Sequence, residues 1–177
     1  NPINLDTPFP RFSWALQTNQ RGQKQTAYQV QVRYGNVLLW DSGKVVTIQT
    51  MAEYAGIPLT SQHEASWQVR VWDGQDVPSP YSESCGFRLG LLHPSDWQAE
   101  WIGYPADWNG QALYFRRTFT LDKPVRSAWA YIAGLGCYEL HLNGTKVGDH
   151  VLDPGFTDYG KRVLYATYNL RPFIRDG

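Results

Sequence analysis

The stretch TAYQVQVRY, Thr26–Tyr34, decides the fold class of this chain, because apolar and polar side chains alternate along it from its third residue onward. The apolar side of the alternation consists of Tyr28, Val30, Val32 and Tyr34, and the polar side of Gln29, Gln31 and Arg33. A second stretch, ASWQVRVWD (Ala65–Asp73), alternates in the same way. A period of two predicts strands of an antiparallel sheet that is buried on one face.

Short strands between turns are predicted along the whole first half of the chain. Further strands are expected at residues 12–16, 37–40 and 86–89, and no segment of useful length carries a helical stripe. Strands spaced in this way are typical of a β-sandwich, for which about 90 residues suffice. The segment GLLHPSDWQAEWIG (Gly90–Gly103) contains Pro94 and Ser95, which break any strand before Trp97. We therefore expect a first domain at residues 1–91 and a second at residues 92–177.

The second half is also predicted to be antiparallel β-structure. The stretch ALYFRRTFTL (112–121) alternates, although Arg117 interrupts its apolar face. We expect this guanidinium to be ion-paired, to be turned outward by a bulge, or to lie at a binding end. Further strands are expected at 126–136, 138–142, 145–147 and 161–168, with Asn143 and Gly144 as the two positive-φ residues of a type I′ turn. This order favours a second, jelly-roll-like sandwich.

Composition excludes several classes of protein. The 177 residues carry 16 basic and 16 acidic side chains, whereas nucleic-acid-binding proteins usually carry a basic patch or a high isoelectric point. No apolar run reaches the about 18 residues that a membrane span needs. The two cysteines, Cys85 and Cys137, fit neither a disulfide framework nor a zinc motif, and we expect unpaired, half-buried thiols. Aromatic residues make up 15% of the chain, which buried packing explains more often than sugar-stacking platforms do.

No residue of this chain is predicted to be catalytic. Glycoside hydrolysis needs two carboxylates on either side of one bond, and no motif fixes such a pair among the acidic residues here. The four histidines show no spacing typical of a zinc site.

Two loops contain candidates for binding. The loop GDHVLDPGFTDYG (148–160) offers carboxylates and carbonyls to a calcium ion, although aspartates in such loops more often form turns. The calcium candidates are Asp149, Asp153 and Asp158. The candidates for carbohydrate contact are Asp107, Trp108 and Asn109 in the loop PADWNGQ (105–111), and Asn143, which the hairpin turn also needs.

Several stretches resemble one family of enzymes. PRFSWAL (Pro10–Leu16), QTAYQVQV (Gln25–Val32), LWDSGKV (Leu39–Val45) and WQVRVWD (Trp67–Asp73) resemble the fibronectin-type-III-like domain that opens bacterial α-L-rhamnosidases. The likeness continues through GLLHPSDWQAEWIG (Gly90–Gly103) and through Tyr131–Leu170, which resembles the galactose-binding-like sandwich of the same family. The pieces occur in order and at sensible spacing, so the resemblance is specific.

The resemblance implies a parent enzyme that hydrolyses terminal α-L-rhamnose by an inverting mechanism, with its catalytic acids in an (α/α)₆ barrel. This chain is then expected to be a non-catalytic N-terminal fragment that scaffolds the enzyme and contacts substrate, and its second sandwich is expected to be incomplete. Its expected partners are a rhamnose-containing carbohydrate and the remaining domains of the parent chain. No cofactor is expected to be required, and calcium stays open. The alternative is a free-standing carbohydrate-binding or protein-interaction module, because a fold alone does not decide function.

Overall fold

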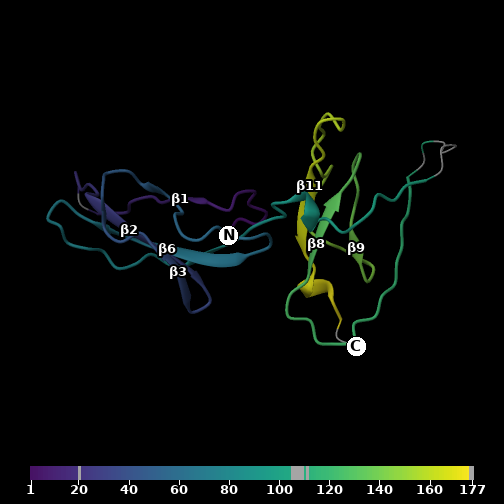
Figure 1. Cartoon of the computed structure of the whole chain (residues 1–177), viewed down its shortest axis with the longest axis horizontal. Helices are drawn as coiled ribbons and strands as arrows, with labels where there is room; N and C mark the ends of the chain where they lie inside the picture. Colours follow the sequence, from purple (N-terminus) through teal and green to yellow (C-terminus); the bar gives the residue numbers. More distant parts are fainter. Residues whose placement is uncertain (20, 105–109, 111, 176–177) are drawn as a thin grey trace. The chain divides into compact units, whose positions relative to one another are not determined.

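The computed structural model describes residues 1–19, 21–104, 110 and 112–175. These residues form strands, turns and two short 3₁₀ helices, η1 (Pro94–Asp96) and η2 (Arg171–Phe173), without any α-helix among them, so the all-β prediction is confirmed. The chain divides into two compact units, Asn1–Gln98 and Ala99–Gly177 (Figure 1). The predicted domain boundary between residues 91 and 92 stays a prediction. In the described part of the chain, no helix is long and apolar enough to cross a membrane.

The first unit is built on one five-stranded antiparallel sheet and one small two-stranded sheet. The larger sheet has the order β3-β2-β6-β7, and β4 pairs with the start of β2. Its strands are β2 (Ala27–Tyr34), β3 (Val37–Asp41), β4 (Val45–Val46), β6 (Glu64–Trp72) and β7 (Cys85–Arg88). The small sheet pairs β1 (Arg11–Ser13) with β5 (Met51–Glu53). The two alternating stretches of the sequence are thus β2 and β6, the central neighbours of the larger sheet.

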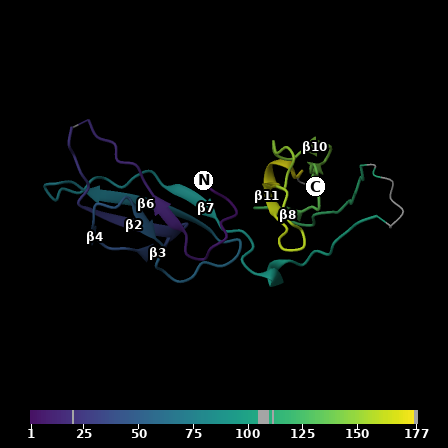
Figure 2. The ribbon, with the colours of Figure 1, turned by 90° about the horizontal axis from the view of Figure 1, so that it is seen from above.

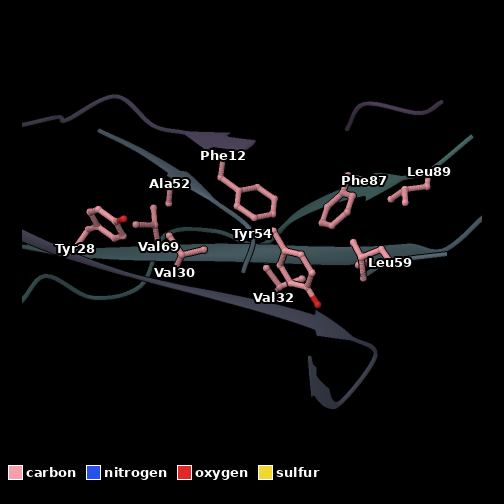
Figure 3. Packing of buried hydrophobic residues seen from close by; sticks show 11 residues of the cluster. Phe12, Tyr28, Val30, Val32, Ala52, Tyr54, Leu59, Val69, Phe87 and Leu89 are labelled. Atoms are coloured by element: carbon pink, nitrogen blue, oxygen red, sulfur yellow. The ribbon is translucent and has the colours of Figure 1, made fainter. Parts of the chain in front are cut away.

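The alternation of β2 and β6 places most of their apolar side chains in one core (Figure 3), whereas Tyr34 at the end of β2 is exposed. Val30 lies opposite Val69 in the ladder, and Val30 and Val32 are both completely buried. Phe12 of β1 stacks on Trp67 of β6 with the ring centroids 4.8 Å apart, so the small sheet closes over the larger one. Complete burial of a valine side chain contributes about 1.5–3 kcal/mol to folding, which makes this register costly to shift.

The polar side chains of the same strands form a hydrogen-bonded network on the opposite face. Asp41 accepts hydrogen bonds from Gln29 (2.7 Å) and Gln31 (2.8 Å), and Gln29 accepts one from Arg70 Nε (2.9 Å). Burial by itself raises the pKa of Asp41, but the hydrogen bonds from the two glutamines and from the Gly43 N–H outweigh it, so the pKa lies below its ordinary value. The network links β3, β2 and β6 side by side.

The second unit contains two antiparallel pairs of strands. The strands β8 (Trp129–Ala133) and β11 (Tyr165–Asn169) lie side by side (Figure 2), and β9 (His141–Leu142) forms a hairpin with β10 (Thr145–Lys146). Asn143 and Gly144 join the hairpin with φ angles of 52° and 81°, as a type I′ turn requires. The core of this unit is formed by Val147, Ala166 and Tyr168, with Tyr138, Leu140 and Leu142 packed against it. The jelly-roll order of strands stays a prediction.

Several details of the sequence-based prediction are wrong. The first strand covers Arg11–Ser13 rather than 12–16, and β9 covers only His141–Leu142 rather than 138–142. The stretch at 112–121 forms no strand in its described residues, because alternation alone does not supply a hydrogen-bonded neighbour and no described segment pairs with it. The last strand begins at Tyr165 rather than at residue 161, because the N–H groups of Lys161 and Arg162 bond to the carbonyl of Asp158 in a turn. The two cysteines are free, as predicted, but both are exposed rather than half-buried.

Candidate functional site

A groove of about 730 Å³ lies beside the β9–β10 hairpin in the second unit. Its volume falls within the range of about 300–1,000 Å³ that is common for ligand sites. One wall is the extended segment 115–121, and the other is formed by the hairpin and the residues after η2. The lining residues are Phe115, Arg116, Arg117, Thr118, Phe119, Thr120, Leu121, His141, Leu142, Asn143, Gly144, Ile174 and Arg175.

The hairpin wall is held in place by its turn. Asn143 adopts a positive φ, which an asparagine tolerates better than most residues, and its Nδ2 donates a hydrogen bond of 3.0 Å to the carbonyl of Phe173. This bond ties the turn to η2, so the strand β9 and the residues after η2 line the groove together. Asn143, a candidate for carbohydrate contact, thus lines the groove, and it is also the turn residue that the hairpin needs.

The opposite wall presents aromatic, cationic and hydroxyl groups in one short segment. Phe115 is 57% exposed and Phe119 is 61% exposed, and Arg116 and Arg117 lie between them in the sequence. Arg117, expected to be paired, turned outward or at a binding end, is exposed and lines the groove. Exposed aromatic faces beside several hydrogen-bond donors can hold a ligand that has both apolar C–H groups and hydroxyls.

The charge of the groove is of one sign. Its lining includes three arginines and His141, and none of the described lining residues is acidic. Glu139, two residues before β9, is engaged by the hairpin: Lys146 Nζ lies 2.7 Å and His141 Nε2 3.4 Å from its carboxylate. Hydrogen bonds from Lys146 and then from His141 hold the pKa of Glu139 below its ordinary value. The groove is therefore locally basic, although the whole chain has a formal net charge of zero.

The other predicted site residues are placed differently. Asp107, Trp108 and Asn109 lie outside the described residues. Asp149, Asp153 and Asp158 are described, but they are not brought together, and the described residues contain no group of three histidine, cysteine or acidic side chains that could hold a metal ion.

Two of these aspartates have structural partners instead. The Asp153 carboxylate accepts a hydrogen bond of 3.1 Å from the Tyr168 hydroxyl and lies 2.8 Å from His150 Nδ1, and Asp158 closes a turn and pairs with Lys161 at 3.1 Å. Burial raises the pKa of Tyr168, which therefore keeps its proton and acts as a donor to Asp153. These partners have a physical reason: aspartates in a loop that contains glycine and proline readily form hydrogen bonds to nearby groups and fix the turn.

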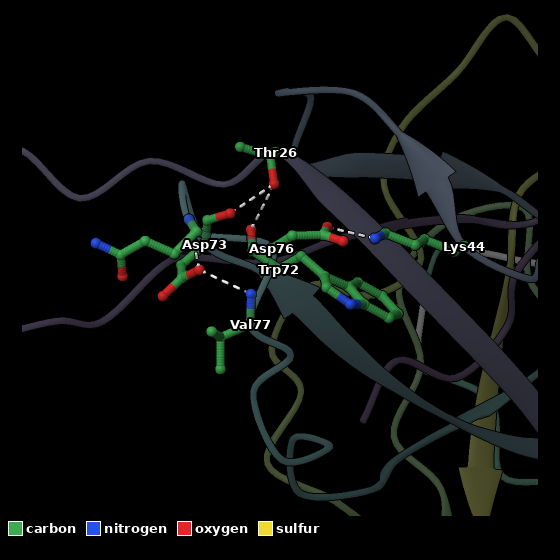
Figure 4. Close-up of polar contacts among 7 residues, drawn as sticks. Thr26, Lys44, Trp72, Asp73, Asp76 and Val77 are labelled. Atoms are coloured by element: carbon green, nitrogen blue, oxygen red, sulfur yellow. Dashed lines mark hydrogen bonds and ion pairs between the residues drawn. The ribbon is translucent and has the colours of Figure 1, made fainter.

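A smaller pocket of about 250 Å³ lies at the end of β6 in the first unit, but its described polar groups serve the fold (Figure 4). The carboxylate of Asp73 accepts a hydrogen bond of 2.9 Å from the N–H of Val77, and the hydroxyl of Thr26 donates one of 2.7 Å to the carbonyl of Asp73. Lys44 Nζ lies 4.9 Å from the centre of the Trp72 ring and is also paired with Asp76. These contacts in and beside the pocket stabilise the end of β6, and the groove of the second unit is the better candidate site.

Most of the groove was not identifiable from the sequence. Phe115, Arg116, Phe119 and Arg175 received no site prediction, because nothing in a linear pattern shows that residues 115–121 face a hairpin formed by 141–146. The local signals were Arg117, an arginine on an otherwise apolar face, and Asn143, the turn residue that was also a candidate for carbohydrate contact.

Comparison with known proteins gives the family. Residues 1–93 match the model described as Rha78A-like, N-terminal immunoglobulin domain, and residues 123–177 match the α-L-rhamnosidase N-terminal domain. A curated α-L-rhamnosidase of Formosa agariphila is 36% identical over 194 aligned residues, which cover 100% of this chain and 21% of that protein.

Solved structures agree with this result. The structure of an α-L-rhamnosidase from Dictyoglumus thermophilum matches with a TM-score of 0.89 and 39% identity, over 100% of this chain and 23% of that one. An α-L-rhamnosidase of Streptomyces avermitilis, solved in complex with L-rhamnose, matches with a TM-score of 0.57 and 29% identity, over 99% of this chain and 20% of that one. The chain thus spans about a fifth of the length of these relatives. It belongs to the α-L-rhamnosidase family, of which it carries the N-terminal immunoglobulin-like domain and residues of the α-L-rhamnosidase N-terminal domain.

Proposed function

We propose that this chain forms non-catalytic N-terminal domains of an α-L-rhamnosidase, which scaffold the enzyme and contact its rhamnose-containing substrate through the groove of the second unit. The remaining domains of the parent chain hydrolyse terminal α-L-rhamnose by an inverting mechanism and are the first partner of this chain. The substrate is the second partner. The Streptomyces relative solved with L-rhamnose supports the choice of sugar.

The observation that carries the substrate contact is the chemistry of the groove. A pyranose has apolar C–H faces and a rim of hydroxyls. The groove offers the exposed rings of Phe115 and Phe119 for the first, and Thr118, Thr120 and the guanidiniums for the second. A concave site that combines aromatic rings with hydrogen-bond donors suits a sugar better than a flat site with the same groups.

The test is a titration of the 177-residue chain with methyl α-L-rhamnoside, followed by NMR saturation transfer. We expect binding that Phe119→Ala weakens by several-fold, because the substitution removes one aromatic face of the groove. Tyr114→Ala is the matched control, since Tyr114 is 96% exposed and does not line the groove. Equal losses for the two variants, or no saturation transfer to the unsubstituted chain, would contradict the proposed contact.

No cofactor is required in this proposal, and calcium is the ion that the loop with Asp149, Asp153 and Asp158 would bind through carboxylates and carbonyls. Melting curves in calcium and in EDTA decide this point. A higher melting temperature in calcium that Asp149→Asn abolishes would indicate a site in this loop, whereas equal melting temperatures would exclude it.

A second candidate function is protein interaction, favoured by the loop that follows β10. Val151 and Leu152 are each 79% exposed, and Phe156 is 78% exposed. Apolar side chains exposed together on one loop are typical of surfaces that contact another protein or domain.

A further inference from the structure

Three arginines line the groove, and a neutral sugar as the ligand does not explain why they gather there. Arg116 and Arg117 lie on the extended wall, and Arg175 lies on the opposite wall after η2. None of the three has an ion-pair partner within the described parts of the chain.

This charge is local rather than a property of the whole protein. The chain has 16 basic and 16 acidic residues, yet the described lining of the groove has three arginines and no acid. Like charges around one concavity repel one another, and a bound anion relieves that repulsion. At physiological salt the Debye length is about 8 Å, so charges that share one groove still act on a ligand inside it.

Arginine also suits one kind of anion geometrically. Its planar guanidinium offers parallel N–H donors that match the two oxygens of a carboxylate or two oxygens of a sulfate. The exposed rings of Phe115 and Phe119 on the same wall remain available to the C–H face of a sugar ring.

We infer that the groove binds an acidic saccharide, that is, a rhamnose-containing glycan with a carboxylate or sulfate close to the rhamnose. This inference rests on the proposed sugar-binding function and adds to it the charge of the ligand. Rhamnose contacts the aromatic wall, and the anionic group lies between Arg117 and Arg175. A carboxylate and a sulfate share the chemistry that the arginines recognise, so the experiment includes both.

The experiment measures dissociation constants of the 177-residue chain by calorimetry for three disaccharides that contain rhamnose. One carries a neutral second sugar, one a glucuronate and one a sulfated sugar. We expect the acidic ligands to bind at least about tenfold more tightly than the neutral one, and this preference to shrink between 50 and 200 mM NaCl. A preference for the glucuronate or for the sulfated sugar then identifies the natural anion.

Variants separate the charge from the sugar. Arg117→Gln and Arg175→Gln, on opposite walls, should each weaken the acidic ligands about tenfold more than they weaken the neutral one, because each removes a charge-assisted contact that only an anion makes. Arg21→Gln, an exposed arginine of the first unit, is the control and should change nothing. Two variants on different segments guard against a local folding defect in one of them.

The outcomes distinguish this inference from the function on which it rests. Equal affinity for neutral and acidic ligands would overturn the inference and leave rhamnose binding in place. No binding of any of the three would overturn both. Binding of polyglutamate that competes with the acidic disaccharides and shows the same loss in both arginine variants would overturn the saccharide and indicate an acidic polypeptide as the occupant.

Discussion

Replacement of Gln25 by alanine should strongly destabilise the first unit, because this side chain joins three separate segments of it. Gln25 is only 3% exposed. Its Oε1 accepts a hydrogen bond of 2.9 Å from Trp14 Nε1, and its Nε2 donates to the carbonyls of Thr47 (3.3 Å) and Gln49 (2.7 Å). The side-chain amide thus connects the segment after β1, the start of β2 and the segment between β4 and β5.

The expected loss follows from these three bonds. A hydrogen bond between neutral groups contributes about 0.5–1.5 kcal/mol, and a buried group left without its partner costs about 1–3 kcal/mol. The bond to Thr47 is long and counts for little. Removal of the other two hydrogen bonds leaves the indole N–H of Trp14 without its partner in a partly buried position. Together these changes should lower the free energy of unfolding by about 2–4 kcal/mol. A middle value of about 3 kcal/mol corresponds to roughly a hundredfold lower protection against exchange.

Native-state hydrogen exchange on peptides from β2 measures this directly, because the strongly protected amides of the central strand exchange only when the first unit unfolds. Gln75→Ala is the matched control: it is the same substitution at an exposed position where only the backbone N–H is hydrogen-bonded, and a change within about 0.5 kcal/mol is expected. A loss of protection below threefold for Gln25→Ala, or an equal loss for both variants, would refute this account of the three bonds.

Four further predictions concern pH, the second unit and activity. The folded pKa of Asp41 lies below its ordinary value of 3.8, so this carboxylate stabilises the fold above about pH 4, and its contribution is lost as the pH falls further. In urea titrations, Asp41→Asn should therefore lose less stability between pH 5 and pH 2 than the unsubstituted chain does. Tyr168→Phe removes the buried hydroxyl that donates to Asp153 and should lower the free energy of unfolding, measured by hydrogen exchange of β11, by about 1–2 kcal/mol. Tyr159→Phe is the control, because the described residues give its hydroxyl no hydrogen bond, and it should change this free energy very little. Equal effects of the two variants would contradict the role of the Tyr168 bond. Amides of β8 should exchange faster than those of β2, because the core of the second unit buries fewer side chains, and equal protection in a monomer would show that both units are equally stable. The purified chain should not release nitrophenol from a nitrophenyl α-L-rhamnoside, and activity that rises with the amount of purified chain would show that catalytic groups are present after all.

The sequence by itself determined the elements whose causes are local. Alternation along Thr26–Tyr34 and Ala65–Asp73 placed Tyr28, Val30, Val32 and Val69 in the core, because successive side chains of a strand point to opposite faces. Tyr34, at the end of the same alternation, is 57% exposed. The hairpin turn at Asn143 and Gly144 followed from the few residues that accept positive φ angles. The family resemblance added the two-part organisation, which the matches to residues 1–93 and 123–177 support.

The tertiary structure decided what depends on partners that are distant in sequence. The stretch at 112–121 has the alternation of a strand, but a strand also needs a neighbour for its backbone, and none of the described segments supplies one. Arg117 could be paired, turned outward or at a binding end on the evidence of its own segment, and only the position of the hairpin at 141–146 made it part of a groove. Asp153 accepts a hydrogen bond from Tyr168, fifteen positions away, a partner that its own loop does not reveal. A carboxylate, a guanidinium or an unpaired backbone takes the nearest suitable partner in space, and that partner is fixed only when the chain has folded.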